Sequence, residues 1–385
     1  MAEKNTHRKV LYLIDTLEMG GAEQSILEIA SRFKNFSAVV CHIYPGHTLR
    51  PAYEAAGIEV VSLNLPTGSK HKVILPELLK VVERFQPVLI HASLYRSMMV
   101  SRKLKRITGL PLVNSFVSNS YAPARTDKLK WTTRLKLRYY QMLDASTSKI
   151  PDVYISNSNA IAESNAKALK ISKSKIRVIH RGRSIERYGH VTGAQVAAVR
   201  SAMGLNNQRI VLNVGRLRQA KGQADLIRAF SKIHHLFPDS VLWIAGEGTY
   251  RSVLEQLVRE LNLSEAVQLL GNRNDVEVLM AAADVFVFPS YYEGLPGVIL
   301  EAMMAGKIIV ASDIPENREC IDEYSALFFP VGDTERIALQ VSNVLQDTQS
   351  FKGLGERASG VAHEKFDIHQ IARQYEEVYQ QLIQS

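Results

Sequence analysis

The sequence contains few cysteines and no long hydrophobic run, and both absences exclude classes of protein. Only Cys41 and Cys320 occur among the 385 residues, which excludes a disulfide framework or a cysteine-rich metal site. The longest apolar stretch is interrupted by Glu301 and Lys307 and falls short of the roughly 18 residues that cross a bilayer. The polar N-terminus leads into a short apolar run that Asp15 ends, unlike a signal peptide. We therefore expect a cytoplasmic protein without a membrane-spanning segment.

Acidic residues are scarce in one stretch of the chain, which concentrates the net charge of +9 there. Arg96 to Arg187 holds 20 Lys/Arg against 5 Asp/Glu, whereas the remainder holds 27 against 33. Such asymmetry favours an anionic partner, which would be a nucleic acid, a membrane surface or a phosphorylated substrate. A solvated basic surface that serves solubility is the alternative.

Short β-branched runs alternate with helical apolar spacing in both halves of the chain. This alternation predicts parallel sheets covered by helices on both faces. The strands expected in the first half are 10–14, 38–43, 59–63, 88–92, 112–116, 153–157 and 177–180. Those expected in the second half are 210–214, 241–245, 267–269, 285–288, 308–311 and 326–329. We therefore expect an α/β protein with two doubly wound domains, and ligands at the carboxyl ends of their strands.

Glycines follow the first strand and a later one. The pair Gly20-Gly21 leaves room for backbone amides and a helix start to meet a phosphate, although a tight turn without a ligand explains it equally well. Gly246-Glu247-Gly248 offers the same approach in the second half, where a structural turn is the alternative. Neither segment is the G-x-G-x-x-G of dinucleotide oxidoreductases.

Two cations follow the strand at 210–214. Arg216 and Lys221 come at the strand end and at a helix start near Gly222, where fixed positive charges can neutralise a departing diphosphate. Surface charge on either side of a turn is the alternative.

Two carboxylates with seven residues between them lie on either side of the start of another helix. Pro296 fits the first helical position, which puts Glu293 on the loop ahead of the helix and Glu301 inside it. The amides of Gly297 and Val298 can bind phosphate, Glu293 can accept sugar hydroxyls, and Glu301 can hold a ribose. Otherwise Glu293 is a helix-start anion and Glu301 an exposed helix residue, but an apolar helix makes an unpartnered Glu301 costly.

Together these residues resemble the retaining glycosyltransferases of family 4, which have the GT-B fold. The resemblance rests on Gly20-Gly21-Ala22-Glu23, Gly215-Arg216 with Lys221, Gly246-Glu247-Gly248, Gly271-Asn272-Arg273 and Glu293-x7-Glu301, and spans nearly the whole chain. It implies hexosyl transfer with retention from a nucleotide-diphosphate sugar, UDP-sugar favoured over GDP-sugar. The acceptor would be a glycan or a lipid-linked molecule of cell-envelope polysaccharide or glycolipid synthesis.

The resemblance also implies roles for individual residues. Arg216 and Lys221 would bind the donor diphosphate, and Glu293 the donor sugar. These three are the expected catalytic residues. The other expected donor-binding residues are Gly21, Gly246, Asn272, Arg273, Gly294, Leu295, Gly297, Val298 and Glu301, of which Glu301 would hold the ribose and the backbone at Asn272-Arg273 would border the base.

The implied architecture is two Rossmann-like domains that face each other across a cleft. Residues 1–188, joined by a C-terminal helix at 366–385 that crosses back, would bind the acceptor, and residues 189–365 the donor. The acceptor-side candidates are Gly20, His91, Ser118 and Asn119. Val117 stands where many relatives carry a His near the reacting sugar, so that contact would be missing or supplied by Ser118 or Asn119. His91 can equally be structural.

We expect neither a cofactor nor a metal. The sequence has no Asp-x-Asp, the acidic pair by which the other major transferase fold holds a divalent ion. Cations and amides would replace magnesium, and the expected mechanism is a front-face displacement in which the leaving phosphate helps to remove the acceptor proton.

The segment Arg125–Arg138 is dense in cations and carries Trp131 and Leu135. It suits peripheral contact with anionic lipid on the inner face of the cytoplasmic membrane, although an ordinary helix with a solvated basic face explains it nearly as well. Nucleic acid is not an expected partner, because no recognition module is present. A nucleotide-sugar 2-epimerase, or a non-catalytic protein that binds a nucleotide sugar or nucleic acid, remains the alternative function.

Overall fold

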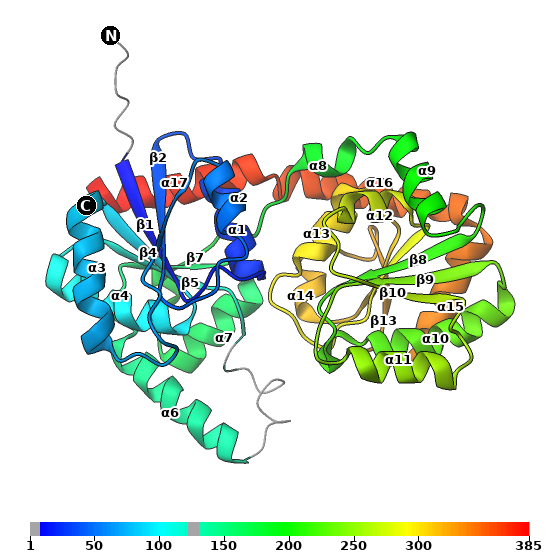
Figure 1. Ribbon diagram of the computed structural model, residues 1–385, viewed down its shortest axis with the longest axis horizontal. Coiled ribbons are helices and arrows are strands. Elements are labelled where there is room, and N and C mark those ends of the chain that lie inside the picture. The colour runs from blue at the N-terminus through cyan, green and yellow to red at the C-terminus, as the bar shows by residue number, and fades with distance from the viewer. Residues whose placement is uncertain (1–7, 120, 122–130, 385) are drawn as a thin grey trace, which may run out of the picture. The chain divides into compact units, whose positions relative to one another are not determined.

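The computed structural model describes residues 8–119, 121 and 131–384 and divides into two compact units. The first unit comprises Met1–Gly182 and Ile368–Ser385, and the second comprises Arg183–Asp367. Each unit is a parallel sheet with helices on both faces (Figure 1). This confirms the expected pair of doubly wound Rossmann-like domains.

The first unit contains a seven-stranded sheet in the order β3-β2-β1-β4-β5-β6-β7. Its strands are β1 (Arg8–Ile14), β2 (Phe36–His42), β3 (Glu59–Ser62), β4 (Leu89–Ser93), β5 (Leu112–Phe116), β6 (Val153–Ser156) and β7 (Ile176–Val178). Its helices are α1 (Gly21–Ala30), α2 (Arg50–Ala55), α3 (His71–Phe85), α4 (Tyr95–Thr108), α6 (Trp131–Thr147), α7 (Asn159–Leu169) and α17 (Ile368–Gln384), with a 3-10 turn η1 (Lys173–Lys175).

The second unit contains a six-stranded sheet in the order β10-β9-β8-β11-β12-β13. Its strands are β8 (Arg209–Val214), β9 (Ser240–Ala245), β10 (Val267–Gly271), β11 (Val285–Phe288), β12 (Ile309–Ser312) and β13 (Leu327–Phe329). Its helices are α8 (Ile185–Gly189), α9 (Gly193–Ala202), α10 (Gln223–Leu236), α11 (Arg251–Glu260), α12 (Val276–Ala282), α13 (Gly297–Met304), α14 (Pro315–Arg318), α15 (Thr334–Gln346) and α16 (Thr348–Lys365), with a 3-10 turn η2 (Gln219–Lys221). Every strand expected from the sequence is present, shifted at its ends by at most two residues.

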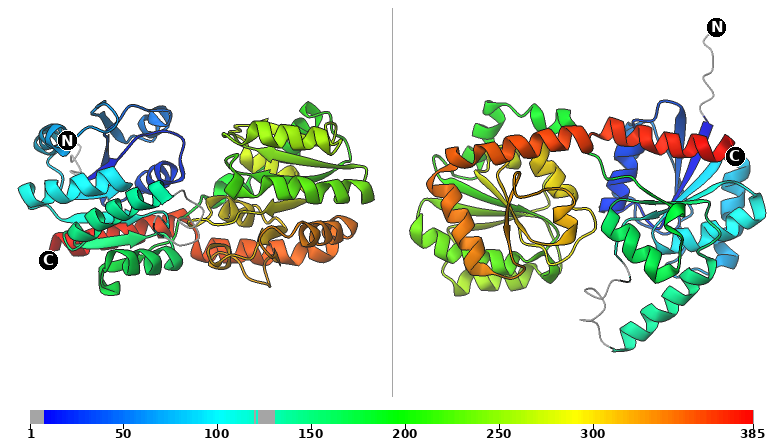
Figure 2. Two further views of the ribbon diagram at one scale, coloured as in Figure 1. Left: turned by 90° about the horizontal axis from the view of Figure 1, so that it is seen from below. Right: turned by 180° about the vertical axis from the view of Figure 1, so that it is seen from behind.

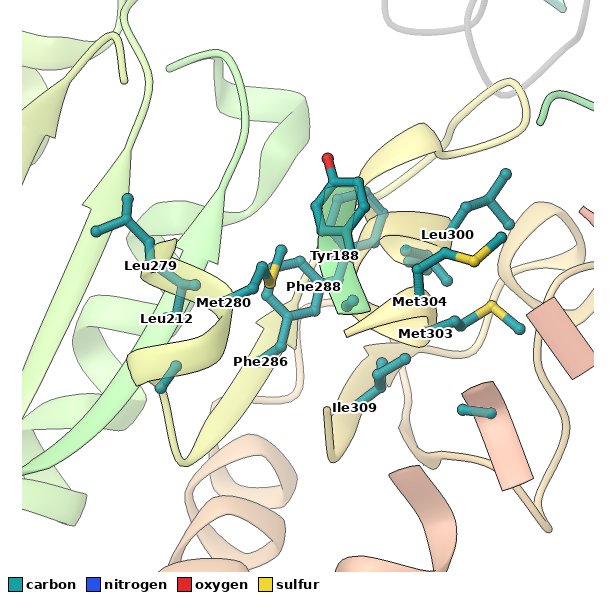
Figure 3. Close-up of a cluster of buried hydrophobic side chains, with 14 of the residues drawn as sticks. Tyr188, Leu212, Leu279, Met280, Phe286, Phe288, Leu300, Met303, Met304 and Ile309 are labelled. Atoms are coloured by element: carbon teal, nitrogen blue, oxygen red, sulfur yellow. The ribbon is translucent and has the colours of Figure 1, made fainter. Parts of the chain in front are cut away.

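The apolar runs form strands because both faces of each sheet are covered. In β1, Val10, Tyr12 and Ile14 pack with α1 and α17, while Leu11 and Leu13 pack on the opposite face with α3 and α4. In the second unit one core lies between the sheet and α8, α12 and α13, and Figure 3 shows some of its side chains, among them Tyr188, Phe286 and Met303. The central strands β4, β5, β9 and β11 are therefore buried along their whole length and present their carboxyl ends from a packed core.

Helix α17 completes the core of the first unit. Its apolar face buries Ile371, Tyr375 and Tyr379, and Figure 2 shows the helix lying across this unit. The chain enters α17 beside Gly182, where an added Cβ would lie 2.8 Å from the Ile368 Cα. The expected return of the C-terminal helix to the first domain is thus confirmed.

Both boundaries of the second unit differ slightly from those expected. The unit begins at Arg183 instead of residue 189, and it ends at Asp367 instead of residue 365. Tyr188 and Phe366 are both buried in the core of the second unit, and the backbone N–H of Arg183 donates to the Phe366 carbonyl at 2.9 Å. Residues 183–188 and 366–367 therefore belong to the second unit, because long-range packing rather than local pattern decides their place.

Candidate functional site

Three loops interlock at the carboxyl ends of β8, β9 and β10. A Cβ at Gly246, whose φ is +136°, would lie 2.1 Å from the Gly215 carbonyl oxygen, and one at Gly248 would lie 2.2 Å from that of Leu217. The Gly246 amide also donates to the Gly271 carbonyl at 2.7 Å. Glycine at Gly246 is required both by its backbone conformation and by this close approach. The loop that carries Arg216 is consequently held in place by its neighbour.

The loop after β8 is also fixed to the loop after β11. Gly222 has a left-handed backbone, and a Cβ there would lie 2.0 Å from the Pro289 carbonyl oxygen. The Tyr291 amide donates to the Ala220 carbonyl at 2.9 Å. Helix α10 then begins at Gln223, whose side-chain amide donates to the Arg216 carbonyl at 3.1 Å. The expected helix start near Gly222 is confirmed.

These loops bring Lys221 and Glu293 together although 71 residues lie between them in the chain. The Lys221 ammonium forms an ion pair with Glu293 Oε1, and the two side chains are only 25% and 11% exposed. Lys221 also lies 5.8 Å from the centre of the Phe288 ring. The ammonium and the carboxylate, which the sequence suggested for separate roles, therefore form one ion pair.

Helix α13 begins one residue later than expected. Pro296 is the N-cap, with an extended ψ of 101°, and Gly297 is the first helical residue. The first backbone amides of any helix have no acceptor within the helix, and here no side chain of the described residues caps them. The loop ahead of it includes Gly294 and the buried Leu295. An uncapped helix start suits an anion.

Inside α13, Glu301 does not face solvent. Its Oε1 accepts a hydrogen bond from the Arg183 Nε–H at 2.8 Å, and the two side chains are 16% and 5% exposed. This excludes the reading of Glu301 as an exposed helix residue and supplies the partner that burial demands.

Asn272 and Arg273 follow β10 directly. The Arg273 guanidinium is bound to Asp275 at 2.8 Å through Nε, and Gly271 ahead of them has a φ of +68°. The side chain of Arg273 is therefore engaged within its own loop, which leaves the backbone as the expected contact for a base.

In the first unit, the Gly20-Gly21 turn forms the start of α1. Gly20 is its N-cap, and the buried Glu23 folds its carboxylate back over Gly20. A Cβ at Gly21 would lie 3.4 Å from the Arg181 guanidinium. A helix start and a cation thus meet at this turn.

His91 lies in the middle of β4 and is 1% exposed. Its Nδ1 pairs with the Tyr379 hydroxyl and its Nε2 with the Ser115 hydroxyl, both at 2.6 Å, and Tyr379 also bonds to the Tyr12 hydroxyl at 2.5 Å. Burial lowers the pKa of His91 to about 3. Both ring nitrogens are engaged between the sheet and α17, which favours the structural alternative for His91.

Ser118 and Asn119 follow β5, and Val117 packs against the core as a partly buried side chain. The Ser118 carbonyl accepts from the Asn165 side chain at 3.3 Å, and Asn119 Oδ1 is buried with no hydrogen-bond partner in the ranges that the structure describes. Asn157, at the end of β6 and 6% exposed, leaves both its side-chain oxygen and nitrogen without a partner among the described residues. Polar groups at this edge of the first sheet are therefore open to hydrogen bonding.

The expected basic segment is present from residue 131 onward as α6, and residues 125–130 lie outside the described residues. Figure 1 shows the start of α6 projecting from the first unit. Trp131, Leu135, Tyr139 and Met142 are 72%, 54%, 55% and 65% exposed, and their spacing places them on one face. Asp144 is the one buried residue of the helix. Within the described ranges, no helix has the length and apolar character that a bilayer span requires.

Comparison with known proteins agrees with this geometry. The family model for Glycosyltransferase Family 4 matches residues 19–187, and that for Glycosyl transferases group 1 matches residues 198–360. The crystal structure of Anabaena HepE in complex with UDP and glucose superposes with a TM-score of 0.86 at 25% identity, over 97% of this chain and 100% of that one. The chain is a GT-B glycosyltransferase.

Two characterised relatives of this glycosyltransferase differ in what they act on. The N-acetyl-alpha-D-glucosaminyl L-malate synthase of Bacillus anthracis is 30% identical over 174 residues, 45% of either chain. The UDP-Gal:alpha-D-GlcNAc-diphosphoundecaprenol alpha-1,3-galactosyltransferase of Escherichia coli is 28% identical over 291 residues, 74% of this chain and 73% of that one. The first alignment thus spans less than half of the relative.

Three residues of this glycosyltransferase escaped the sequence analysis. Arg183 was hidden in a basic stretch, and Asn157 carries no local signal. Glu316, at the start of α14, is 7% exposed, and burial raises its pKa, as does the nearby charge of Glu293. The Pro315-Glu316 pair, which begins three residues after the end of β12, is the one signal that would have pointed to Glu316.

Proposed function

We propose that the protein transfers a hexose, with retention of configuration, from a UDP-sugar to a glycan or lipid-linked acceptor of cell-envelope synthesis. The observation that carries the proposal is the Lys221–Glu293 ion pair beside the uncapped start of α13. The UDP bound in HepE supports UDP as the nucleotide of the donor. The Escherichia coli relative supports a lipid-linked acceptor. The proposed activity therefore depends on the similarity to these two proteins and on the geometry around Lys221 and Glu293.

The second unit would bind the donor. Arg216, Lys221 and the free amides at Gly297 and Val298 supply the positive charge that a leaving diphosphate needs, so the reaction would proceed without a metal or other cofactor. The sugar would lie against Glu293, whose carboxylate Lys221 holds in place.

The first unit would bind the acceptor, at the edge formed by Gly20, Ser118 and Asn119. In a front-face displacement, the bond from the anomeric carbon to the diphosphate oxygen breaks as the acceptor hydroxyl oxygen bonds to that carbon on the same face. The acceptor proton passes to the leaving phosphate, and the cations stabilise the charge that develops.

A thermal-shift panel of UDP, GDP, ADP and TDP tests the donor site, because a ligand that binds only the folded state raises its stability. We expect UDP to stabilise the protein without metal, and Lys221→Met or Arg216→Ala to abolish the shift. Incubation with UDP-sugars and analysis of products then separates transfer from 2-epimerisation, which would yield an altered donor without acceptor. Tighter binding to DNA than to any nucleotide at physiological salt would contradict the proposal.

We further propose that α6 contacts an anionic membrane surface, on the cytoplasmic side. Its exposed apolar face would insert at the lipid boundary, while Arg134, Lys136 and Arg138 meet lipid phosphates. At about 1 kcal/mol for each cation near such a surface, the three together contribute roughly a hundredfold in partitioning.

Vesicle co-sedimentation checks this contact. We expect binding to phosphatidylcholine vesicles that contain phosphatidylglycerol, weakened by salt and lost in the triple variant Arg134→Gln/Lys136→Gln/Arg138→Gln. Lys232→Gln in the second unit is the matched control. Binding that neither salt nor the triple variant reduces would exclude the electrostatic contact.

A further inference from the structure

The pairing of Arg183 with Glu301 leaves one carboxylate oxygen open. Oε1 accepts from the Arg183 Nε–H at 2.8 Å, whereas Oε2 accepts no hydrogen bond from any described residue and is not fully buried. A carboxylate has lone pairs on both oxygens, so Oε2 can accept hydroxyl hydrogen bonds while Oε1 stays occupied. Arg183 thus fixes which oxygen faces a ligand.

The backbone of Arg183 is itself fixed. Its N–H donates to the Phe366 carbonyl at 2.9 Å, and it forms a parallel bridge with Asp367. Phe366 is 1% exposed in the core of the second unit. The guanidinium therefore reaches Glu301 from an anchored main chain and is 5% exposed, which restricts the directions from which it can hold the carboxylate.

A second cation near Glu301 does not share this role. The charge of Glu301 contributes to raising the pKa of Arg187, but the Arg187 guanidinium bonds to Glu277 at 2.9 Å and is 47% exposed. The two arginines offer a matched pair, one hydrogen-bonded to Glu301 and buried, the other bonded elsewhere and half exposed.

We propose that Arg183 is a positioning residue for nucleotide recognition, which holds Glu301 so that Oε2 accepts the ribose hydroxyls of the donor. The inference rests on the proposed function, since it takes the nucleotide to lie at α13. Because charge-assisted hydrogen bonds are strong, the wild-type protein should bind UDP about ten- to a hundredfold more tightly than 2′,3′-dideoxy-UDP.

Calorimetric titration with these two nucleotides tests the role. In Arg183→Met, the affinity for UDP should fall at least tenfold while that for dideoxy-UDP changes less than twofold, so the discrimination collapses. Arg183→Lys should recover part of it, because an ammonium can also donate to Oε1. Arg187→Met should retain the wild-type ratio. These readouts differ from a general loss of stability, which would weaken both nucleotides alike.

Arg183→Met leaves Glu301 as an unpaired, largely buried charge, which endangers folding. The double variant Arg183→Met/Glu301→Gln removes that charge, and it too should bind both nucleotides equally. Retention of the wild-type ratio in a folded Arg183→Met or in the double variant would overturn the inference alone. Equal binding of both nucleotides by the wild type would also overturn it and leave the proposed function standing, whereas no binding of UDP or GDP by the wild type would overturn both.

Discussion

The carboxyl ends of the two sheets differ in how their polar groups are used. In the second unit, Lys221 pairs with Glu293 and Arg183 with Glu301. The buried side-chain amides of Asn213 and Gln223 donate through their nitrogens, while their oxygens have no partner within the described ranges. In the first unit, Asn157 leaves both amide atoms unpartnered among the described residues.

This difference indicates which kind of ligand the carboxyl end of each sheet can bind. Side chains that a partner already holds in place need not move when the ligand binds. They suit a part of the ligand that does not vary, such as a diphosphate or a ribose. Open groups gain their partners from the ligand itself. We therefore expect the paired side chains of the second unit to bind their ligand with little rearrangement, and the amide of Asn157 to take its partners from the ligand.

We expect the largest effect on activity when the Lys221–Glu293 pair of the second unit is removed. Lys221→Met removes the partly buried cation beside Glu293 and should lower kcat for sugar transfer about a hundredfold or more, the scale of losing one fixed electrostatic contact. Steady-state kinetics with a UDP-sugar measure it. Lys232→Met, which removes an exposed ion pair with Glu335 in the same unit, should leave kcat unchanged. Equal activity of Lys221→Met and wild type would refute the assignment of the donor site.

The interlocked loops should be nearly as sensitive. Gly246→Ala forces a Cβ toward the Gly215 carbonyl and strains a φ of +136°, which should lower the free energy of unfolding by about 3 kcal/mol or more. Gly360→Ala is the control, because its Cβ would meet nothing within 4 Å and α16 gains a better helix former, stabilising it by about 0.5–1 kcal/mol. Urea titration distinguishes the two, and a tolerated Gly246→Ala would mean that the loop is mobile.

The buried histidine of the first unit should make this unit sensitive to acid. Its folded-state pKa of about 3 lies below the ordinary value of 6.5, so the unfolded state binds more protons as the pH falls, and stability is lost from about pH 6.5 downward. Between pH 7 and pH 5 His91 should cost about 2 kcal/mol.

Unfolding in urea at both pH values, with His91→Gln, measures that cost. His91→Gln should show a smaller loss, by this amount, whereas Tyr379→Phe should keep the pH dependence and lose stability at both. An identical pH dependence in His91→Gln and wild type would show that another group is responsible.

The smallest effect should come from the open side. Asn157→Ala removes amide atoms that have no hydrogen-bond partner in the described part of the chain, so it should raise KM for the acceptor about two- to tenfold with little change in kcat or stability. Asn165→Ala, whose side-chain nitrogen donates to the Ile161 carbonyl at 3.0 Å, should instead lower the melting temperature. An unchanged acceptor KM in Asn157→Ala would show that the acceptor does not bind to Asn157.

Most of the fold could be predicted because periodicity is local. β-branched runs such as Val10–Ile14 and Ile210–Val214 became buried strands, and turn glycines marked their ends. The unit boundary was misplaced because Tyr188 and Phe366 carry no periodic signal and are assigned by packing with distant residues.

The site was predictable where a motif fixes residue types and not where a contact joins distant segments. Lys221 and Glu293 were each expected, but their pairing depends on loops that meet only in the folded unit. His91 was proposed for the acceptor because its partner Tyr379 is 288 positions away, and the sequence does not reveal that α17 covers it. Arg183 was overlooked for the same reason.

The place of α17 has a consequence for the order in which the protein is made. Ile368, Ile371 and Tyr379 belong to the same core as Val10, Tyr12 and Ile14 of β1, which is synthesised before the second unit. While the ribosome translates the whole second unit, the first sheet lacks the helix that covers one of its faces. The second unit can fold during synthesis, but the first can close its core only after the last residues of α17 have left the exit tunnel.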